Sequence, residues 1–393
     1  MYIRTLRPEE HDRLNLIHAI AYEFPWEPPK PDAEPQPDDM IWWMAGEGDE
    51  LFASVGVLPM RVRFDGQIVT AGGVGGVATL PQHRRGGAIR ACIGRALEDM
   101  YARGDVFSML YPFSRAYYRK FGYADGASVA TWTIPFGALN LPDMGGSVDM
   151  ILPGGDLEPL AQVYRAAAAN WNLSVEETKH IESMNKKNWL KDCRYLYIWR
   201  DEAGVPAGAM MFHKKDRVMD CTTQFGAANL FLFRDVRAMA ALLNFGKRFA
   251  ADYDSVRFQM PQGVRADNLI SEGNSVGCSV GSNGMLRVVN VEKALEKCAC
   301  TGSGMVTIMV RDPMLPQNTG TWRVEFCEGE ANRVAKTDAE PDIVLPIHDF
   351  SQLIAGVRCA ADLAMMPEAE IRNSDAPFGH IFRAKTCHLI DLF

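Results

Sequence analysis

The sequence lacks any uninterrupted apolar run of about 18 residues, the length that a membrane-spanning helix requires. It also lacks an excess of positive charge, because 41 Lys and Arg stand against 49 Asp and Glu, for a formal net charge of -8. Nucleic-acid binding rewards basic patches, so this balance argues against a nucleic-acid partner. The first residues, MYIRTLRPEEHDRL, contain no apolar segment for export, so we expect a cytoplasmic protein with no membrane partner.

Cysteine is sparse and scattered. The nine cysteines are odd in number and show no framework spacing, which predicts reduced thiols rather than disulfides. Cys298 and Cys300 form the only close pair in the sequence, and no histidine lies near enough along the chain to complete a zinc site with them. We therefore expect no metal.

The order of expected elements divides the chain into three regions. At 393 residues the chain exceeds one ordinary core. Residues 1–145 alternate strand and helix around a mixed sheet, with a hairpin turn at Asp65–Gly66 and a further strand in ASVATWTIPF (127–136). Residues 146–285 repeat the order of hairpin, strand, helix and strand. Residues 286–393 place strands before helices, so the fold class is α/β followed by α+β.

The stretch GGVATLPQHRRGGAIRACIGRAL, from Gly75 to Leu97, combines a strand end, a loop of two arginines and two glycines, and the start of a helix that we expect over 88–103. The first N–H groups of a helix lack partners and the helix dipole is positive there, so such a loop suits an anion. Glycines allow a phosphate to approach the backbone, and two guanidinium groups can neutralise a diphosphate. A tight turn with two solvated arginines explains the same residues.

Two motifs in this region resemble those of the GNAT acetyltransferase superfamily. PQHRRGGA resembles its acetyl-CoA loop, R-x-x-G-x-G/A, with Arg84 and Gly87 in the first two fixed positions and Ile89 in the last. AYYRKFGY resembles its Tyr-x-x-x-Gly-Phe helix, with Tyr118 and Gly122 in the matching places. Together with YYRKFGYADGA and LRVVNVEKALE, these motifs resemble the enhanced intracellular survival (Eis-like) family over essentially the full chain.

The resemblance implies an acetyl-CoA-dependent N-acetyltransferase that acts by direct transfer on primary amines of a cationic, aminoglycoside- or lysine/polyamine-like substrate. It implies tandem GNAT-like mixed-sheet domains, the first at 1–145 and catalytic, the second at 146–285 and degenerate. A sterol-carrier-like α+β domain at 286–393 would follow. It also implies a homo-oligomer, commonly a hexamer in this family. The alternative is a lipid- or small-molecule-binding protein with a vestigial GNAT unit.

The resemblance also assigns catalytic roles. Tyr118 matches the general acid, and a phenol suits the protonation of a departing thiolate. The C-terminal carboxylate, here that of Phe393, matches the base. A core aromatic at Tyr118 and a frayed end at Phe393 are the alternatives. His83 is a candidate base by residue type, although structural use in the loop is the simpler explanation.

The remaining site residues follow from the same resemblance. Pantetheine would lie along Gly75–Thr79, where backbone N–H groups of Val77 and Thr79 would bond the thioester carbonyl; the glycines there could also form a β-bulge. The expected acetyl-CoA site comprises Val77, Ala78, Thr79, Arg84, Arg85, Gly86, Gly87 and Ala88. The expected substrate contacts are Phe24, Trp26 and Asp391, since acidic and aromatic residues suit a cationic amine.

Overall fold

The computed structural model describes residues 1–28, 39–176, 181, 184, 187–222, 230–271 and 273–389. These form two compact units. Unit 1 contains residues 1–126 and 284–384, and unit 2 contains residues 127–283 with the segment that starts at 385. This division into compact units is not a division into domains, so the domain boundaries expected at 145 and 285 remain predictions. Among the described helices, none is both long and apolar enough to cross a membrane.

Unit 1 begins with a mixed sheet whose order, within the described residues, is β1-β2-β3-β4-β5-β15-β6. Its strands are β1 (Tyr2–Thr5), β2 (Ile41–Glu47), β3 (Glu50–Phe64), β4 (Gln67–Thr79), β5 (Phe107–Leu110), β15 (Met285–Val288) and β6 (Ala124–Asp125). The hairpin between β3 and β4 turns at Asp65 and Gly66, which have φ values of 48° and 79°. Two positive φ angles at the turn suit the twist of the flanking strands, and the predicted hairpin is confirmed.

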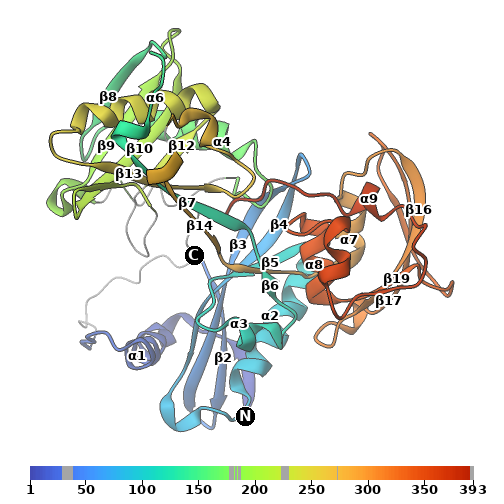
Figure 1. The fold of residues 1–393 in the computed structure, drawn as a ribbon. Helices are drawn as coiled ribbons and strands as arrows, with labels where there is room; N and C mark the ends of the chain where they lie inside the picture. The colour runs from blue at the N-terminus through green and yellow to red at the C-terminus, as the bar shows by residue number, and fades with distance from the viewer. Residues whose placement is uncertain are drawn as a thin grey trace. The chain divides into compact units, whose positions relative to one another are not determined.

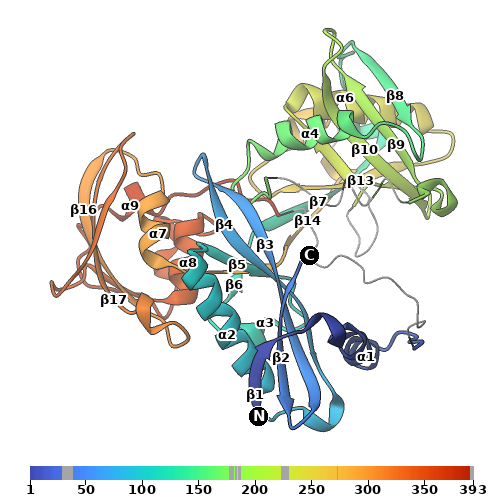
Figure 2. The ribbon, with the colours of Figure 1, turned by 180° about the vertical axis from the view of Figure 1, so that it is seen from behind.

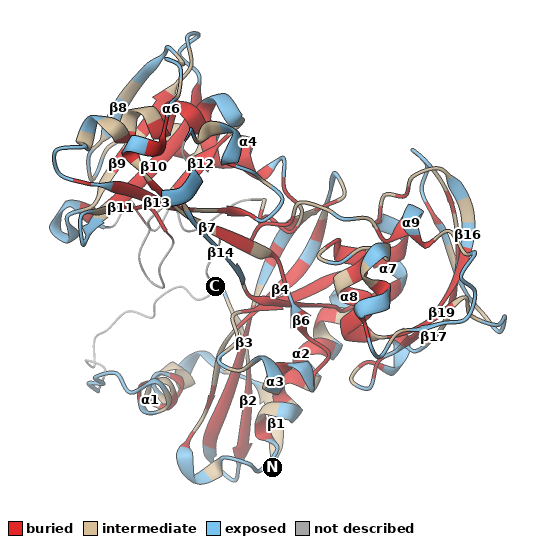
Figure 3. Cartoon of the chain, in the orientation of Figure 1, coloured by how far each residue is buried: buried red, intermediate tan, exposed pale blue. Residues whose placement is uncertain are grey.

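Two helices cover opposite faces of this sheet, α1 (His11–Tyr22) and α2 (Ala88–Arg103), as Figures 1 and 2 show from opposite sides. The middle strands β2 and β3 are largely buried between them (Figure 3). The predicted helix at 88–103 is confirmed. It is flanked by Gly87 and Gly104, each with φ 83°, a backbone conformation that favours glycine and marks both ends of the helix.

Two strands pair in a different sheet from the one that their sequence order suggests. The C-terminal region was expected to open with the strand that begins at Leu286, but this strand is part of β15, which pairs antiparallel with β5 and β6 of the first sheet. The strand in ASVATWTIPF was expected in that first sheet, but β7 (Ser128–Pro135) pairs with two strands of unit 2. Residue pattern specifies a strand without specifying its partner, so both assignments were wrong.

Unit 2 is a second sheet that carries helices on both faces. Within the described residues its order is β14-β7-β13-β11-β10-β9-β8, and β12 also pairs with β10. The elements not yet given are β8 (Ser147–Ile151), α4 (Glu158–Ala168), β9 (Tyr195–Arg200), β10 (Pro206–Lys215), β11 (Val218–Asp220), β12 (Leu230–Phe233), α6 (Val236–Gly246), β13 (Ser255–Pro261) and β14 (Gly277–Ser282). Alternate residues of β10 face the two helices: Ala209 and Met211 share a core with α4, whereas Met210 and Phe212 share one with α6.

The C-terminal part of unit 1 is an α+β arrangement, as expected. Within the described residues its sheet has the order β18-β17-β16-β19-β20. Its elements are α7 (Val291–Lys297), β16 (Ser303–Arg311), β17 (Gly320–Cys327), β18 (Arg333–Thr337), β19 (Ile343–Pro346), α8 (Ile347–Ala355), β20 (Glu370–Ile371) and α9 (Phe378–Ile381). Helix α8 holds β15, because the Ser351 hydroxyl accepts the Val288 N–H at 2.8 Å.

Candidate active site

The candidate site lies where β4 and β5 stop pairing. Their parallel register ends at Val74 opposite Leu110, where β5 also ends. β4 continues to Thr79. Beyond Val74, β4 pairs with β3 alone among the described strands, so one of its edges has no strand partner. This is the stretch along which the family resemblance implies that pantetheine would lie.

A pocket of about 740 Å³ lies beside this unpaired edge. Its walls come from the end of α1, from β4, from the loop before α2, and from α3 (Arg115–Arg119) with the residues around it. Of the residues expected at an acetyl-CoA site, the lining includes Val77, Ala78, Thr79, Arg84, Arg85, Gly87 and Ala88. Gly86 is an exposed residue of the same loop and is not among the lining residues. Sequence reasoning had not placed Tyr22, Phe113, Lys120 or Phe121 in the wall.

A β-bulge interrupts β4 at the pocket. Gly76 and Val77 together oppose the single residue Val55 of β3. Gly76 has φ 56°, and a Cβ at this position would lie 2.3 Å from the Trp42 ring, so both the backbone conformation and the space require glycine. The sequence left open whether the glycines make room or form a bulge, and the structure shows a bulge.

Two polar side chains bond the backbone of this bulge, and a third holds one of them. The Ser54 hydroxyl donates to the Gly76 carbonyl at 2.8 Å, and the Tyr22 hydroxyl donates to the Val77 carbonyl at 3.1 Å. His18 Nε2 lies 3.0 Å from the Ser54 hydroxyl. Sequence reasoning missed all three residues. The available signal was the spacing of His18 and Tyr22, which places them one turn apart on the same face of a helix.

The loop before α2 presents positive charge at the pocket. Arg84 and Arg85 are exposed, and neither guanidinium has a carboxylate partner in the described part of the chain. Gly87 is the N-cap of α2, whose first N–H groups lack intrahelical partners. The loop therefore combines two cations with the positive end of a helix, which is the arrangement expected for a diphosphate.

His83 anchors the same loop through its ring. It stacks on Phe52 with the ring centroids 4.1 Å apart and an interplanar angle of 10°, and its Nε2 is 3.8 Å from a carboxylate oxygen of Glu50. His83 also lines the pocket. These contacts match the structural use that the sequence favoured for this residue.

Tyr118 lies on the short helix α3, which begins where the Ser114 hydroxyl accepts the Tyr117 N–H. Tyr118 is 3% exposed and packs edge-to-face on its neighbour Tyr117, which lines the pocket. Burial raises the pKa of the Tyr118 phenol above its usual value, and the neighbouring phenol of Tyr22 raises it further. Tyr118 therefore keeps its proton at neutral pH, as a general acid must.

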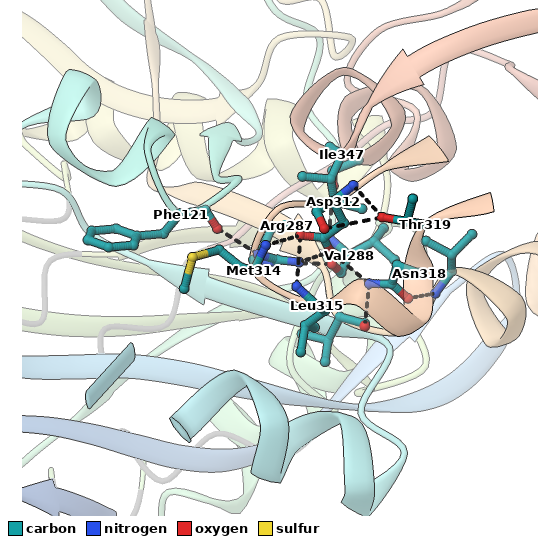
Figure 4. Close-up of polar contacts among 12 residues, drawn as sticks. Phe121, Arg287, Val288, Asp312, Met314, Leu315, Asn318, Thr319 and Ile347 are labelled. Atoms are coloured by element: carbon teal, nitrogen blue, oxygen red, sulfur yellow. Dashed lines mark hydrogen bonds and ion pairs between the residues drawn. The ribbon is translucent and has the colours of Figure 1, made fainter. Parts of the chain in front are cut away.

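A buried ion pair fixes the chain just after α3 (Figure 4). Arg287 of β15 donates from Nη1 to the carbonyl of Phe121 at 2.6 Å, and its other terminal nitrogen pairs with Asp312. Both side chains are fully buried. Asp312 also accepts hydrogen bonds from the Asn318 side chain at 2.8 Å and from the Met314 backbone at 3.0 Å. Because Phe121 lines the pocket, this network positions one of its walls.

The expected substrate residues are only partly described. Phe24 and Trp26 are exposed, and Phe24 stacks on Tyr22 with centroids 6.5 Å apart. Asp391 and Phe393, the expected substrate contact and base, lie outside the described residues. Within the part of the chain that the structure describes, no group of three or more His, Cys, Asp or Glu could hold a metal ion.

The N-terminal and C-terminal parts of the chain match two different family models. Residues 2–125 match the model of the acetyltransferase (GNAT) domain family. Residues 291–386 match the model of the sterol carrier protein domain family. An uncharacterised N-acetyltransferase from Streptomyces avermitilis is 22% identical over 330 residues, which are 79% of this chain and 78% of that protein.

Solved structures share the fold along the whole chain. A conserved protein of unknown function from Enterococcus faecalis V583 is 20% identical with a TM-score of 0.85, over 100% of this chain and 99% of that chain. Eis1 from Mycobacterium abscessus is 21% identical with a TM-score of 0.81, over 100% of both chains. At these identities the likeness establishes the fold.

Proposed function

We propose that this chain, whose residues 2–125 match the GNAT acetyltransferase domain model and whose residues 291–386 match the sterol carrier protein domain model, transfers acetyl from acetyl-CoA to a primary amine of a cationic substrate. The observation that carries the proposal is the pocket between the bulge in β4 and the loop of Arg84 and Arg85. In this pocket the bulge, whose backbone suits a thioester, lies next to a loop that suits a diphosphate.

The residues of the pocket fit acetyl-CoA. Arg84 and Arg85, with the N-terminus of α2, would hold the diphosphate. The edge of β4 that has no strand partner would bond pantetheine. The Val77 N–H, next to the bulge, would donate to the thioester carbonyl and stabilise the negative charge that develops on its oxygen.

Acetyl transfer then requires two proton movements. The amine nitrogen adds to the thioester carbon, which places negative charge on the carbonyl oxygen, and the C–S bond then breaks as the carbonyl forms again. Tyr118 would give its proton to the departing sulfur, in keeping with a phenol that stays protonated at neutral pH. The proton lost by the amine would pass to a base, for which the carboxylate of Phe393 remains a prediction.

The substrate class follows from aromatic surface and from net charge. Phe24 and Trp26 present aromatic surface just beyond α1, and the net charge of the chain is negative, both of which suit a cationic amine. We expect an aminoglycoside, a polyamine or a lysine-bearing molecule. The homo-oligomer expected from the sequence also remains a prediction, which light scattering on the purified protein would test.

The proposal is tested by measuring thiol release from acetyl-CoA with a panel of aminoglycosides, polyamines and lysine peptides. We expect amine-dependent release with at least one class. Calorimetry with acetyl-CoA alone is the companion measurement. If no amine supports release and acetyl-CoA does not bind, the GNAT unit is vestigial and the lipid- or small-molecule-binding alternative takes its place.

A further inference from the structure

The peptide that joins Gly76 to Val77 is the part of the bulge nearest to the expected chemistry. It is a trans peptide, so its carbonyl and its N–H point in opposite directions. The carbonyl accepts the Ser54 hydroxyl at 2.8 Å. The Val77 N–H therefore points away from Ser54, and Val77 is a half-buried residue of the pocket wall.

The proton count at Ser54 fixes the direction of the next hydrogen bond. A serine hydroxyl has one proton, and Ser54 donates it to the Gly76 carbonyl. The contact of 3.0 Å to His18 then requires that the Nε2 of His18 carry a proton and donate to the serine oxygen. A chain of donors runs from His18 through Ser54 to the Gly76 carbonyl.

These hydrogen bonds fix the position of the Gly76–Val77 peptide and also change its polarity. A peptide carbonyl that accepts a strong hydrogen bond becomes more polarised, and its own N–H becomes a better donor. Ser54 is fully buried, so water does not compete for this bond. The same device appears one residue later, where the Tyr22 hydroxyl holds the Val77 carbonyl.

We propose that Ser54, held by His18, is a positioning residue that aims and polarises the Val77 N–H toward the thioester carbonyl of acetyl-CoA. The inference rests on the proposed acetyltransferase function and adds to it the side chains that set up the backbone donor. Neither side chain touches the reacting atoms: Ser54 acts through the Gly76–Val77 peptide, and His18 acts through Ser54.

The direct test is isotope-edited infrared spectroscopy of acetyl-CoA labelled with carbon-13 at the thioester carbonyl. On the wild-type protein the carbonyl band should move to lower frequency relative to free acetyl-CoA. Ser54→Ala should lose most of this shift. It should also lower kcat by about tenfold, a smaller loss than removal of an oxyanion donor itself, while KM for acetyl-CoA changes by less than about twofold.

Ser108→Ala is the matched control. It also removes a buried hydroxyl from a strand of the same sheet, but Ser108 bonds the Tyr123 hydroxyl at 2.7 Å and not the bulge. The control should melt at a lower temperature, as Ser54→Ala should, and yet keep the infrared shift. Ser54→Thr retains a hydroxyl donor and should recover part of the shift, which separates the hydrogen bond from packing.

The His18 pair tests the second link. His18→Gln keeps an N–H donor that could reach Ser54, whereas His18→Phe keeps a ring without a donor. We expect a smaller loss of the shift in His18→Phe than in Ser54→Ala, and a shift close to wild type in His18→Gln. If His18→Phe and His18→Gln both show the wild-type infrared shift, His18 has no part in the proposal.

The outcomes separate the two proposals. If acetyl-CoA does not bind to the wild-type protein, the proposed function fails and this inference fails with it. If it binds with a shifted carbonyl band and Ser54→Ala shows the same shift, the acetyltransferase stands and the role of Ser54 is overturned. A lost shift in both Ser54→Ala and Ser108→Ala would also overturn it, because the effect would then belong to the whole sheet.

Discussion

At the scale of single residues, two adjacent tyrosines compete for the role of acid. Sequence motif selects Tyr118, whereas the pocket wall contains Tyr117. Tyr118 is the more buried of the two, and burial raises the pKa of both phenols, so both keep their protons at neutral pH. Tyr118 contacts the pocket wall through the ring of Tyr117.

Removal of the Tyr118 hydroxyl should therefore affect chemistry and not binding. Tyr118→Phe should lower kcat by roughly 10²-fold while calorimetry shows unchanged affinity for acetyl-CoA. Tyr117→Phe is the matched comparison, since the two residues share one helix and contact each other. A large loss of kcat in Tyr117→Phe with normal turnover in Tyr118→Phe would transfer the role of acid to Tyr117.

The residues that sequence reasoning found and missed differ in a physical way. Arg84 and Tyr118 belong to local motifs, so short stretches of sequence were sufficient. Ser54 and Gly76 are 22 positions apart and meet only because a hairpin pairs them with a bulge between them. Hydrophobic pattern predicts such a hairpin but not which side chain will face which carbonyl.

At the scale of elements, the loop before α2 is the part of the site with the clearest physical basis. Its two guanidinium groups and the helix end all favour an anion, and each contribution is electrostatic. Arg84→Ala with Arg85→Ala should weaken acetyl-CoA binding by about 1–3 kcal/mol, the range for loss of charge-assisted hydrogen bonds. Calorimetry checks this, and an unchanged affinity in the double variant would remove the loop from the site.

The bulge in β4 gives a second prediction at this scale. Gly76→Ala should destabilise the protein by about 1–3 kcal/mol, because alanine would have to occupy a left-handed conformation and push against Trp42. Urea unfolding measures the change. Gly66→Ala is a useful control for backbone conformation alone, because Gly66 also has positive φ but a Cβ there would meet nothing within 4 Å. Equal costs at the two positions would mean that Trp42 yields freely.

Element order was predictable, whereas sheet membership was not. The helix at 88–103 and the hairpin at Asp65–Gly66 follow from glycines at their ends and from turn chemistry, both of which are local. The placement of β7 and β15 depends on pairings across more than a hundred residues. Nothing in the residue pattern of a short strand distinguishes one sheet edge from another.

At the scale of the whole molecule, the GNAT and sterol carrier segments are joined by a buried polar network within unit 1. Arg287 bonds Phe121, which belongs to the GNAT segment, and pairs with Asp312, which belongs to the sterol carrier segment. Arg287 therefore contacts residues of both segments. This network could not be predicted from the sequence, since Arg287 lies in a short strand between the two matched segments.

Loss of the buried Arg287–Asp312 ion pair should destabilise the protein strongly. Asp312→Asn keeps the shape of the side chain but leaves the Arg287 charge buried without a counter-charge, at an expected cost of about 3–5 kcal/mol. Glu370→Gln is the matched control, because it breaks only the exposed pairs with Arg311 and Arg372 and should cost less than about 1 kcal/mol. Denaturant unfolding of both variants gives the comparison. Similar small losses would show that the buried pair contributes little.

The central claim is that acetyl-CoA occupies the pocket beside the unpaired edge of β4, and a crystal structure of the complex tests it most directly. We expect the diphosphate at the N-terminus of α2, against Arg84 and Arg85. The thioester carbonyl should lie within hydrogen-bond distance of the Val77 nitrogen, at about 2.7–3.2 Å. Acetyl-CoA bound elsewhere on the chain, with this pocket empty, would contradict the account.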